Sequence, residues 1–332
     1  MTTTIAGKTV SQNGLGLMRF TEHEAAMPDE ETFAVLKAAV AAGVTLWSAA
    51  DFYGTPESNS LHLLARYFAK YPEDGDKVVV CIKSGVVDMK KLLIDGSAAG
   101  VRRWVASANA ILGGVKKIDV FGIARVDKKV PIEETVGALA ELVAQGAIGG
   151  IQLSEAGPAT IRRAAATAKI DLVEEEVSLW STDVFSKGIA AACAELAIPI
   201  VAHSPLGAGM LTGRIKSLDD LPKGHYPRVF PKFRPGNFEK NLELVRELEK
   251  FARAKGASLP QLTLSWVRAQ SSRPGVPFII PIAGARSANR IKENLAAVDL
   301  SGPDLKAIDD ILACFPVYGT RYPEAGMALV DF

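Results

Sequence analysis

The amino-acid sequence predicts an α/β fold in which eight parallel strands close into a (β/α)8 TIM barrel. Short runs rich in β-branched residues alternate with longer helical patterns along the whole chain. Most of the runs are apolar on nearly every residue, which is typical of parallel strands covered by helices. No long polar linker interrupts the alternation, and eight strand–helix steps in 332 residues fit a closed barrel.

The predicted elements follow one another in a regular order. Strand-like runs occupy residues 14–18, 44–48, 77–85, 117–125, 148–154, 171–180, 198–205 and 276–284. Helical patterns occupy residues 29–43, 59–70, 98–112, 131–146, 157–168, a segment ending near 196, 237–256 and 287–297. Helices 29–43 and 131–146 carry acids in their first turn and glycine at their end, which are start and stop signals. Residues 218–236 are predicted to be a long loop, either functional or a solvated excursion.

The main alternative fold is an open dinucleotide-binding sheet. That fold carries a G-x-G-x-x-G motif between its first strand and first helix. Residues 14–20 (GLGLMRF) have only the first two glycines and no helical pattern directly behind them. The barrel is therefore favoured, with all of residues 1–332 expected to form one domain.

Composition excludes several classes of function. Lys and Arg number 38 against 37 Asp and Glu, which gives no reason to expect a nucleic-acid or membrane partner. The N-terminus lacks a secretory pattern and no apolar run approaches membrane-span length, so a cytoplasmic location is expected. The three cysteines form no C-x-x-C pair and no carboxylate–histidine cluster has ligand spacing, so no metal is expected.

Tyr53 and Lys83 stand where strands of the predicted barrel end. Tyr53 follows the strand over 44–48 and Lys83 closes an otherwise apolar strand. Loops after the carboxyl ends of barrel strands build the active site. An ammonium near a phenol stabilises the phenolate and lowers the phenol pKa, which suits proton exchange with a carbonyl oxygen. The alternative is that Lys83 forms a buried salt bridge, for example with Asp51, and Tyr53 only packs.

Five segments together resemble the aldo-keto reductase superfamily. They are SAADFYG (48–54), CIKSG (81–85), residues 118–155, AHSPLGAGMLTGRI (202–215) and IPIAGARSANRIKENLAA (280–297). Within it, the sequence AHSPL and the strand with VEEE are most similar to the fungal pyridoxal reductases. The resemblance implies a barrel with an N-terminal β-hairpin and extended loops on its C-terminal face. It also implies NADPH as the cofactor and a small carbonyl compound as the substrate.

The resemblance places only part of a catalytic tetrad of Asp, Tyr, Lys and His. Tyr53 and Lys83 fall on the tyrosine and lysine. Ser48 stands at the aspartate position and Ala124 at the histidine position. Asp51, on the same loop as Tyr53, is expected to take over part of the electrostatic partnering of Lys83.

The same resemblance implies a cofactor site. Arg286 and Arg290 would take a 2′-phosphate, and Ser154 the nicotinamide carboxamide. Glu174 stands where a glutamine is usual and His203 where an aromatic stacks on the nicotinamide. The full set of expected cofactor residues is Gly16, Ser154, Glu174, His203, Ser204, Leu206, Gly209, Gly284, Arg286, Arg290, Glu293 and Asn294. His23 is expected in the loop after the first strand.

The expected function is NADPH-dependent reduction of pyridoxal to pyridoxine, with Tyr53 as proton donor. One alternative is a fungal secondary-metabolism reductase acting on an aromatic or polyketide-derived carbonyl. An alternative of another class is an NADPH-binding regulatory module with little turnover, which the two missing tetrad residues favour. The protein is expected to be a monomer or a weak oligomer.

Overall fold

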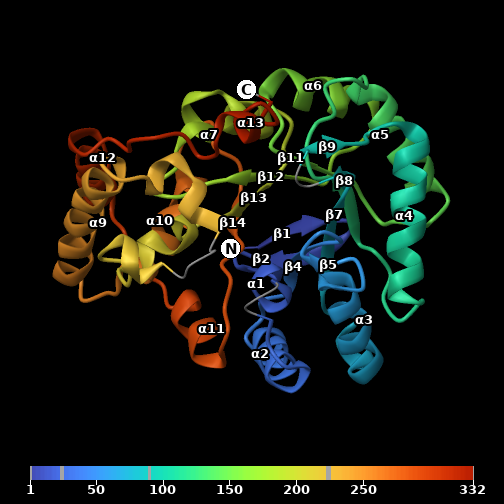
Figure 1. Cartoon of the computed structure of the whole chain (residues 1–332), viewed down its shortest axis with the longest axis horizontal. Helices are drawn as coiled ribbons and strands as arrows, with labels where there is room; N and C mark the ends of the chain where they lie inside the picture. Colours follow the sequence, from blue (N-terminus) through green and yellow to red (C-terminus); the bar gives the residue numbers. More distant parts are fainter. Residues whose placement is uncertain (1, 23–25, 89–90, 222–225, 332) are drawn as a thin grey trace.

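Parallel strands form a ring at the centre of the molecule (Figure 1). The computed structural model describes residues 2–22, 26–88, 91–221 and 226–331. The ring strands are β3 (Gly14–Gly16), β4 (Leu46–Ala50), β7 (Val79–Ser84), β10 (Val120–Ile123), β11 (Gln152–Ser154), β12 (Leu172–Glu176), β13 (Ile200–His203) and β14 (Ile279–Pro281). They form two four-stranded sheets, and parallel bridges Phe121–Ile151 and Gly14–Ile282 join these sheets at both edges. The predicted (β/α)8 barrel is confirmed.

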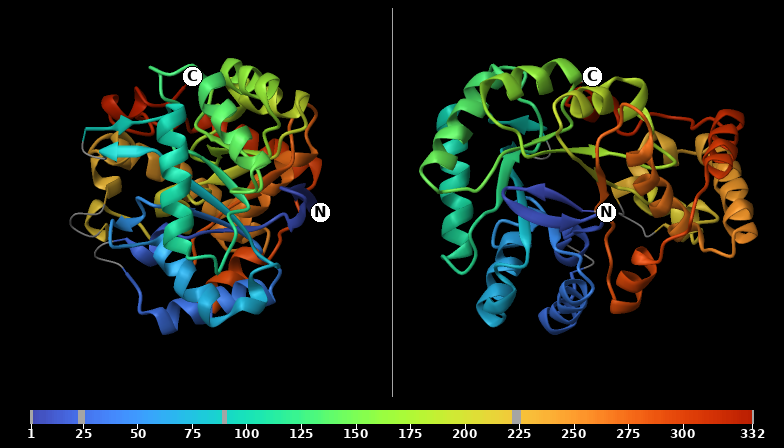
Figure 2. Two further views of the ribbon diagram at one scale, coloured as in Figure 1. Left: turned by 90° about the vertical axis from the view of Figure 1, so that its right-hand side faces the viewer. Right: turned by 180° about the vertical axis from the view of Figure 1, so that it is seen from behind.

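Helices cover the outside of the ring, as the two further views show (Figure 2). The longer ones are α2 (Asp29–Ala41), α3 (Ser60–Lys70), α4 (Ala98–Leu112), α5 (Ile132–Ala144), α6 (Pro158–Thr167), α8 (Ile189–Glu195), α9 (Asn237–Ala254), α10 (Leu259–Ala269), α11 (Ala288–Leu295) and α12 (Gly302–Cys314). Short helices are α1 (Met18–Thr21), α7 (Asp183–Ser186) and α13 (Glu324–Met327). Among the described residues, no helix is both long and apolar enough to span a membrane.

The inside of the barrel is built in layers because alternate residues of each strand point inward. Leu46, Val120, Leu172 and Ile280, from every second strand, belong to one buried interior cluster. The expected N-terminal hairpin, β1 (Thr2–Ile5) and β2 (Lys8–Ser11), adds Ile5 and Val10 to this cluster. Two residues farther along three of these ring strands stand Ser48, Gly122 and Glu174. Polar side chains therefore enter the barrel one layer above the apolar plug.

The loops at the carboxyl ends of the strands are elaborated. Two small hairpins lie there, β5–β6 (Gly54–Thr55 and Ser58–Asn59) and β8–β9 (Val86–Asp88 and Leu93–Ile94). The long connection expected at 218–236 contains single 3-10 turns at Leu218–Asp220, Tyr226–Val229 and Pro231–Phe233, with 222–225 outside the described residues. The C-terminal segment returns over the same face, and α13 lies beside α6 and α7 (Figure 1).

Candidate active site

Tyr53 and Lys83 meet at the mouth of the barrel. Lys83 is the fifth residue of β7, and its inward register is the same as that of buried Cys81. Its Nζ lies 5.5 Å from the centroid of the Tyr53 ring. Tyr53 sits in the turn after β4 and is only partly exposed. The structure thus brings together the two residues that the sequence selected for proton exchange.

Below Tyr53, Lys83 is held by a buried carboxylate from the opposite side of the barrel. Lys83 Nζ lies 2.7 and 2.8 Å from the two carboxylate oxygens of Glu174 and donates to Ser48 Oγ at 2.6 Å. Ser48 Oγ in turn donates to Glu174 Oε2 at 2.9 Å. The side chains of Lys83 and Glu174 are 3% and 2% exposed. Lys83, Ser48 and Glu174 are therefore each hydrogen-bonded to the other two.

The sequence-based expectation about the partner of Lys83 needs correction. Asp51 accepts a hydrogen bond from Ser84 Oγ, and burial raises the pKa of its carboxyl group. The ion-pair partner of Lys83 is Glu174, which the sequence assigned to the cofactor. Sequence patterns do not show this ion pair, because the contacts of Glu174 with Ser48 and Lys83 span 126 and 91 residues of sequence.

The expected lowering of the Tyr53 pKa is also corrected. Burial raises the pKa of the Tyr53 phenol above its ordinary value, although the nearby charge of Lys83 acts in the opposite direction. Burial disfavours the charged form of Lys83, yet the charge of Glu174 keeps the pKa of Lys83 above its usual range. At neutral pH the pair is therefore a neutral phenol beside a charged ammonium, which is the form that donates a proton.

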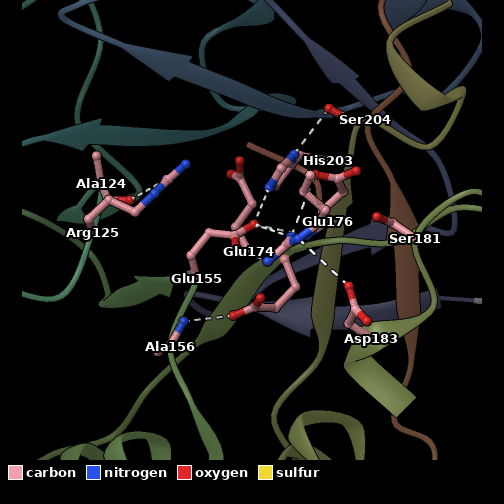
Figure 3. A network of polar contacts seen from close by, with 12 residues as sticks. Ala124, Arg125, Glu155, Ala156, Glu174, Glu176, Ser181, Asp183, His203 and Ser204 are labelled. Atoms are coloured by element: carbon pink, nitrogen blue, oxygen red, sulfur yellow. Dashed lines mark hydrogen bonds and ion pairs between the residues drawn. The ribbon is translucent and has the colours of Figure 1, made fainter. Parts of the chain in front are cut away.

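At the histidine position of the resemblance, Ala124 is buried and carries no polar side chain. The next residue, Arg125, donates from Nη1 to the Ala124 carbonyl at 2.6 Å (Figure 3). Its charge reaches both Tyr53 and the buried Glu155, and its guanidinium lies 5.8 Å from the ring centroid of Tyr322. Arg125 thus brings a positive charge to the mouth that sequence reasoning did not select.

A second buried network surrounds His203 (Figure 3). Glu155, fully buried after β11, lies 2.6 Å from His203 Nε2 and binds both terminal nitrogens of Arg321 at 3.1 and 2.7 Å. Despite burial, the contacts with His203 and Arg321 hold the pKa of Glu155 well below its usual range. His203 Nδ1 lies 3.2 Å from Ser204 Oγ, so both ring nitrogens have partners. Arg321 comes from the C-terminal segment, where no local pattern marked it.

The remaining predicted cofactor residues lie along the same face. Ser154 is buried at the end of β11. Gly16 is the last residue of β3, and a larger side chain does not fit there because a Cβ would lie 3.0 Å from the Ile282 carbonyl oxygen. Ser204 and Gly209 have φ angles of 49° and 105°. Leu206 directly precedes the 3-10 turn Gly207–Thr212, which contains Gly209.

The nucleotide-loop residues gather at the start of α11. Gly284 and Arg286 are exposed, and Ser287 caps the helix through the Arg290 N–H. Arg290 forms an ion pair with Glu293, which also accepts from Ser258 Oγ at 3.2 Å. Asn294 offers its carbonyl to Arg268 at 3.2 Å. His23 lies outside the described residues.

Comparison with known proteins agrees with this geometry. The model of the aldo/keto reductase family matches residues 14–313. "Probable pyridoxal reductase 2" of Schizosaccharomyces pombe is 38% identical over 96% of both chains. "Putative pyridoxal reductase" of Saccharomyces cerevisiae is 34% identical over 94% of this chain and 96% of its own. A glycerol dehydrogenase from Gluconobacter oxydans superposes with a TM-score of 0.81 at 26% identity, covering 96% of this chain and 97% of its own. This chain belongs to the aldo/keto reductase family of oxidoreductases.

Proposed function

We propose that this protein reduces an aldehyde to an alcohol with NADPH, and that pyridoxal is its substrate. The observation that carries the proposal is the Tyr53 phenol beside the charged Lys83 at the mouth of the barrel. The choice of pyridoxal is supported by two relatives named as pyridoxal reductases, at 38% and 34% identity. NADPH is supported by a Schizosaccharomyces pombe relative, 33% identical, whose name specifies NADP(+).

In the proposed reaction, Tyr53 gives its proton to the carbonyl oxygen while that oxygen gains negative charge. The raised pKa of Tyr53 keeps the phenol protonated at neutral pH. Lys83 then stabilises the phenolate that remains, because its charge is held beside the ring in a buried cluster. A bound nicotinamide cofactor supplies the hydride. One hydride and one proton together balance the conversion of aldehyde to alcohol.

The residues of the predicted cofactor site fit an extended dinucleotide. Left-handed φ angles at Ser204, Ala208 and Gly209 fold the loop after β13 back on itself, so that backbone N–H groups can face an anion. The start of α11 offers further N–H groups and the positive end of the helix dipole. Arg286 is exposed beside it and Arg290 lies one turn on. Two guanidinium groups at this position suit the 2′-phosphate of NADPH.

The first experiment measures NADPH binding by fluorescence and NADPH consumption across a panel of aldehydes. We expect binding together with consumption driven by pyridoxal. The variant Tyr53→Phe should lose about 100-fold or more of kcat, since a positioned acid typically contributes that much. Its affinity for NADPH should stay within about threefold of wild type, because the phenol acts on the carbonyl oxygen. Binding without consumption would support the regulatory module, and turnover only of bulky aromatic carbonyls would support the secondary-metabolism reductase.

The second experiment tests cofactor choice. Arg286→Ala and Arg290→Ala should each raise the Kd for NADPH about tenfold or more, since a charge-assisted contact is lost. The Kd for NADH, which lacks the 2′-phosphate, should change little. Lys292→Ala is the matched control, because Lys292 is an exposed cation on the same helix. Equal effects of Arg286→Ala on both cofactors would refute the assignment.

A further inference from the structure

We propose that Glu174, with Ser48, is the positioning residue that holds Lys83 charged and directed at Tyr53. It would do the work that the family resemblance gives to an aspartate at position 48. The proposal rests on the proposed function of Tyr53 and Lys83 and names a residue through which that pair is controlled. It moves Glu174 from the cofactor to the proton-transfer machinery.

Geometry carries the proposal. Both carboxylate oxygens of Glu174 lie within 2.8 Å of Lys83 Nζ, and one accepts from Ser48 Oγ at 2.9 Å. Ser48 Oγ accepts from Lys83 at 2.6 Å, so a single hydroxyl links the ammonium and the carboxylate. Ser48 and Glu174 are each 1% exposed. A carboxylate committed to these contacts has little capacity left for a carboxamide, which leaves that role to neighbours such as Ser154.

Sequence register explains how a residue on β12 can replace one on β4. Leu46 and Leu172 both point into the barrel, so Ser48 and Glu174, two residues farther on, do the same. Their strands are separated by the width of the barrel, and the longer glutamate side chain crosses it to reach Ser48 directly. A short side chain at 48 and a long acid at 174 are therefore complementary.

The Glu174 carboxylate balances the charge of Lys83 next to the Tyr53 phenol. In the wild-type protein, the charges of the Lys83 cation and the Glu174 anion cancel beside the neutral Tyr53 phenol, and Arg125 adds a positive charge that reaches Tyr53 equally in every variant below. Removing the carboxylate leaves one uncompensated positive charge, which burial disfavours. The Tyr53–Lys83 pair then loses its first proton more readily, whichever of the two groups gives it up. The acid needed for reduction should therefore disappear at lower pH.

The test is the pH profile of kcat/KM for aldehyde reduction in four proteins. Relative to wild type, Glu174→Gln should move the basic limb of the profile about one to three pH units lower, the usual effect of one close charge. Ser48→Asp alone places a second carboxylate against Glu174, and two carboxylates this close share one proton, so the charge beside Lys83 and the basic limb should change little. The double variant Ser48→Asp/Glu174→Gln restores one carboxylate and should return the limb to within about half a unit of wild type.

A control variant on the same strand distinguishes the loss of negative charge beside Lys83 from a general disturbance of β12. Glu175 is buried next to Glu174 but accepts a hydrogen bond from the Ala156 N–H at 2.8 Å. Burial raises the pKa of the Glu175 carboxyl, and Glu175→Gln alters a buried acid of the same strand whose hydrogen bond is with Ala156 and not with Lys83. This control should leave the basic limb in place. If Glu174→Gln folds with an unmoved limb, or if the double variant fails to recover, the proposal is overturned.

Titration of the phenol without substrate separates this proposal from the proposed function. The absorbance of tyrosinate is compared between each variant and its Tyr53→Phe counterpart, which isolates Tyr53 from the other tyrosines. A lower titration pH in Glu174→Gln, reversed in the double variant, supports the positioning role even if no aldehyde is reduced. Turnover of pyridoxal with an unchanged Tyr53 titration would keep the proposed function and overturn the role of Glu174.

Discussion

Removing Arg321 should destabilise the protein far more than removing an arginine from a surface ion pair. Arg321 and Glu155 are 3% and 0% exposed, and their contact uses both carboxylate oxygens. Breaking a buried pair by deleting one partner typically costs about 3–5 kcal/mol, because the other charge remains buried and unpaired. His203 also contacts Glu155, so one polar partner of the carboxylate remains in the variant. We therefore expect Arg321→Met to lower the free energy of unfolding by about 3 kcal/mol, the lower end of that range.

The assay is urea unfolding followed by circular dichroism, with a control of the same geometry on the surface. Arg163 contacts Glu133 through two nitrogens at 2.7 and 2.6 Å, but both side chains are about half exposed. Solvent screens such a pair, so Arg163→Met should leave the unfolding midpoint within experimental error. A double variant Arg321→Met/Glu155→Gln should recover part of the loss, because the orphaned charge is gone. A loss below about 1 kcal/mol in Arg321→Met would refute the reasoning, since that is the scale of an exposed pair.

Three further predictions test the packing, the thiols and the acid response. Gly122→Ala would place a Cβ against the Gln152 carbonyl oxygen and should lower the free energy of unfolding in urea by about 1–3 kcal/mol. Gly137→Ala, in the middle of α5 with no neighbouring atoms in the way, should raise it by about 0.5–1 kcal/mol. Equal changes in the two variants would contradict this account. With a thiol reagent, native protein should react once, at exposed Cys314, because the other two cysteines are buried; a second fast thiol would be inconsistent with the packing. Because the pKa of Glu155 is lowered in the folded protein, its carboxylate stabilises the fold fully above the pKa of an unfolded glutamate, and this contribution is lost as the pH falls below about 5. Glu155→Gln should therefore make the free energy of unfolding depend less on pH in that range. An unchanged dependence would count against the ion pair.

Much of the fold could be predicted from sequence because its signals are local. Apolar runs, first-turn acids and terminal glycines mark each strand or helix within a few residues, and the alternation then leaves few topologies. The structure confirms the barrel. The apolar strand that was predicted to end near Lys83 is present as β7, and Lys83 lies next to its last residue. Closure itself depends on bridges such as Gly14–Ile282, which no local pattern contains.

The site was only partly predictable for the same physical reason. Tyr53 and Lys83 each lie at or just after the end of a strand, and this position in the sequence predicted both as site residues. The contact of Glu155 with Arg321 spans 166 residues and joins a strand end to a segment beyond the family match at 313. Its only sequence signal is an arginine in a tail rich in aromatics and proline. The sign of the Tyr53 pKa shift was missed because burial, which outweighs Lys83, is a property of the folded neighbourhood.

The place of Glu174 indicates what a barrel site constrains. In the proposed mechanism a carboxylate lies close to the Lys83 ammonium, and that carboxylate comes from β12 instead of β4. Side chains of alternate strands share a layer inside the barrel, so Ser48 on β4 and Glu174 on β12 compete for the same interior space. In this chain Ser48 leaves room that the longer Glu174 side chain fills, and Glu174 supplies the negative charge beside Lys83. The serine at the aspartate position is therefore offset, in the proposed mechanism, by an acid at the same layer of the opposite strand.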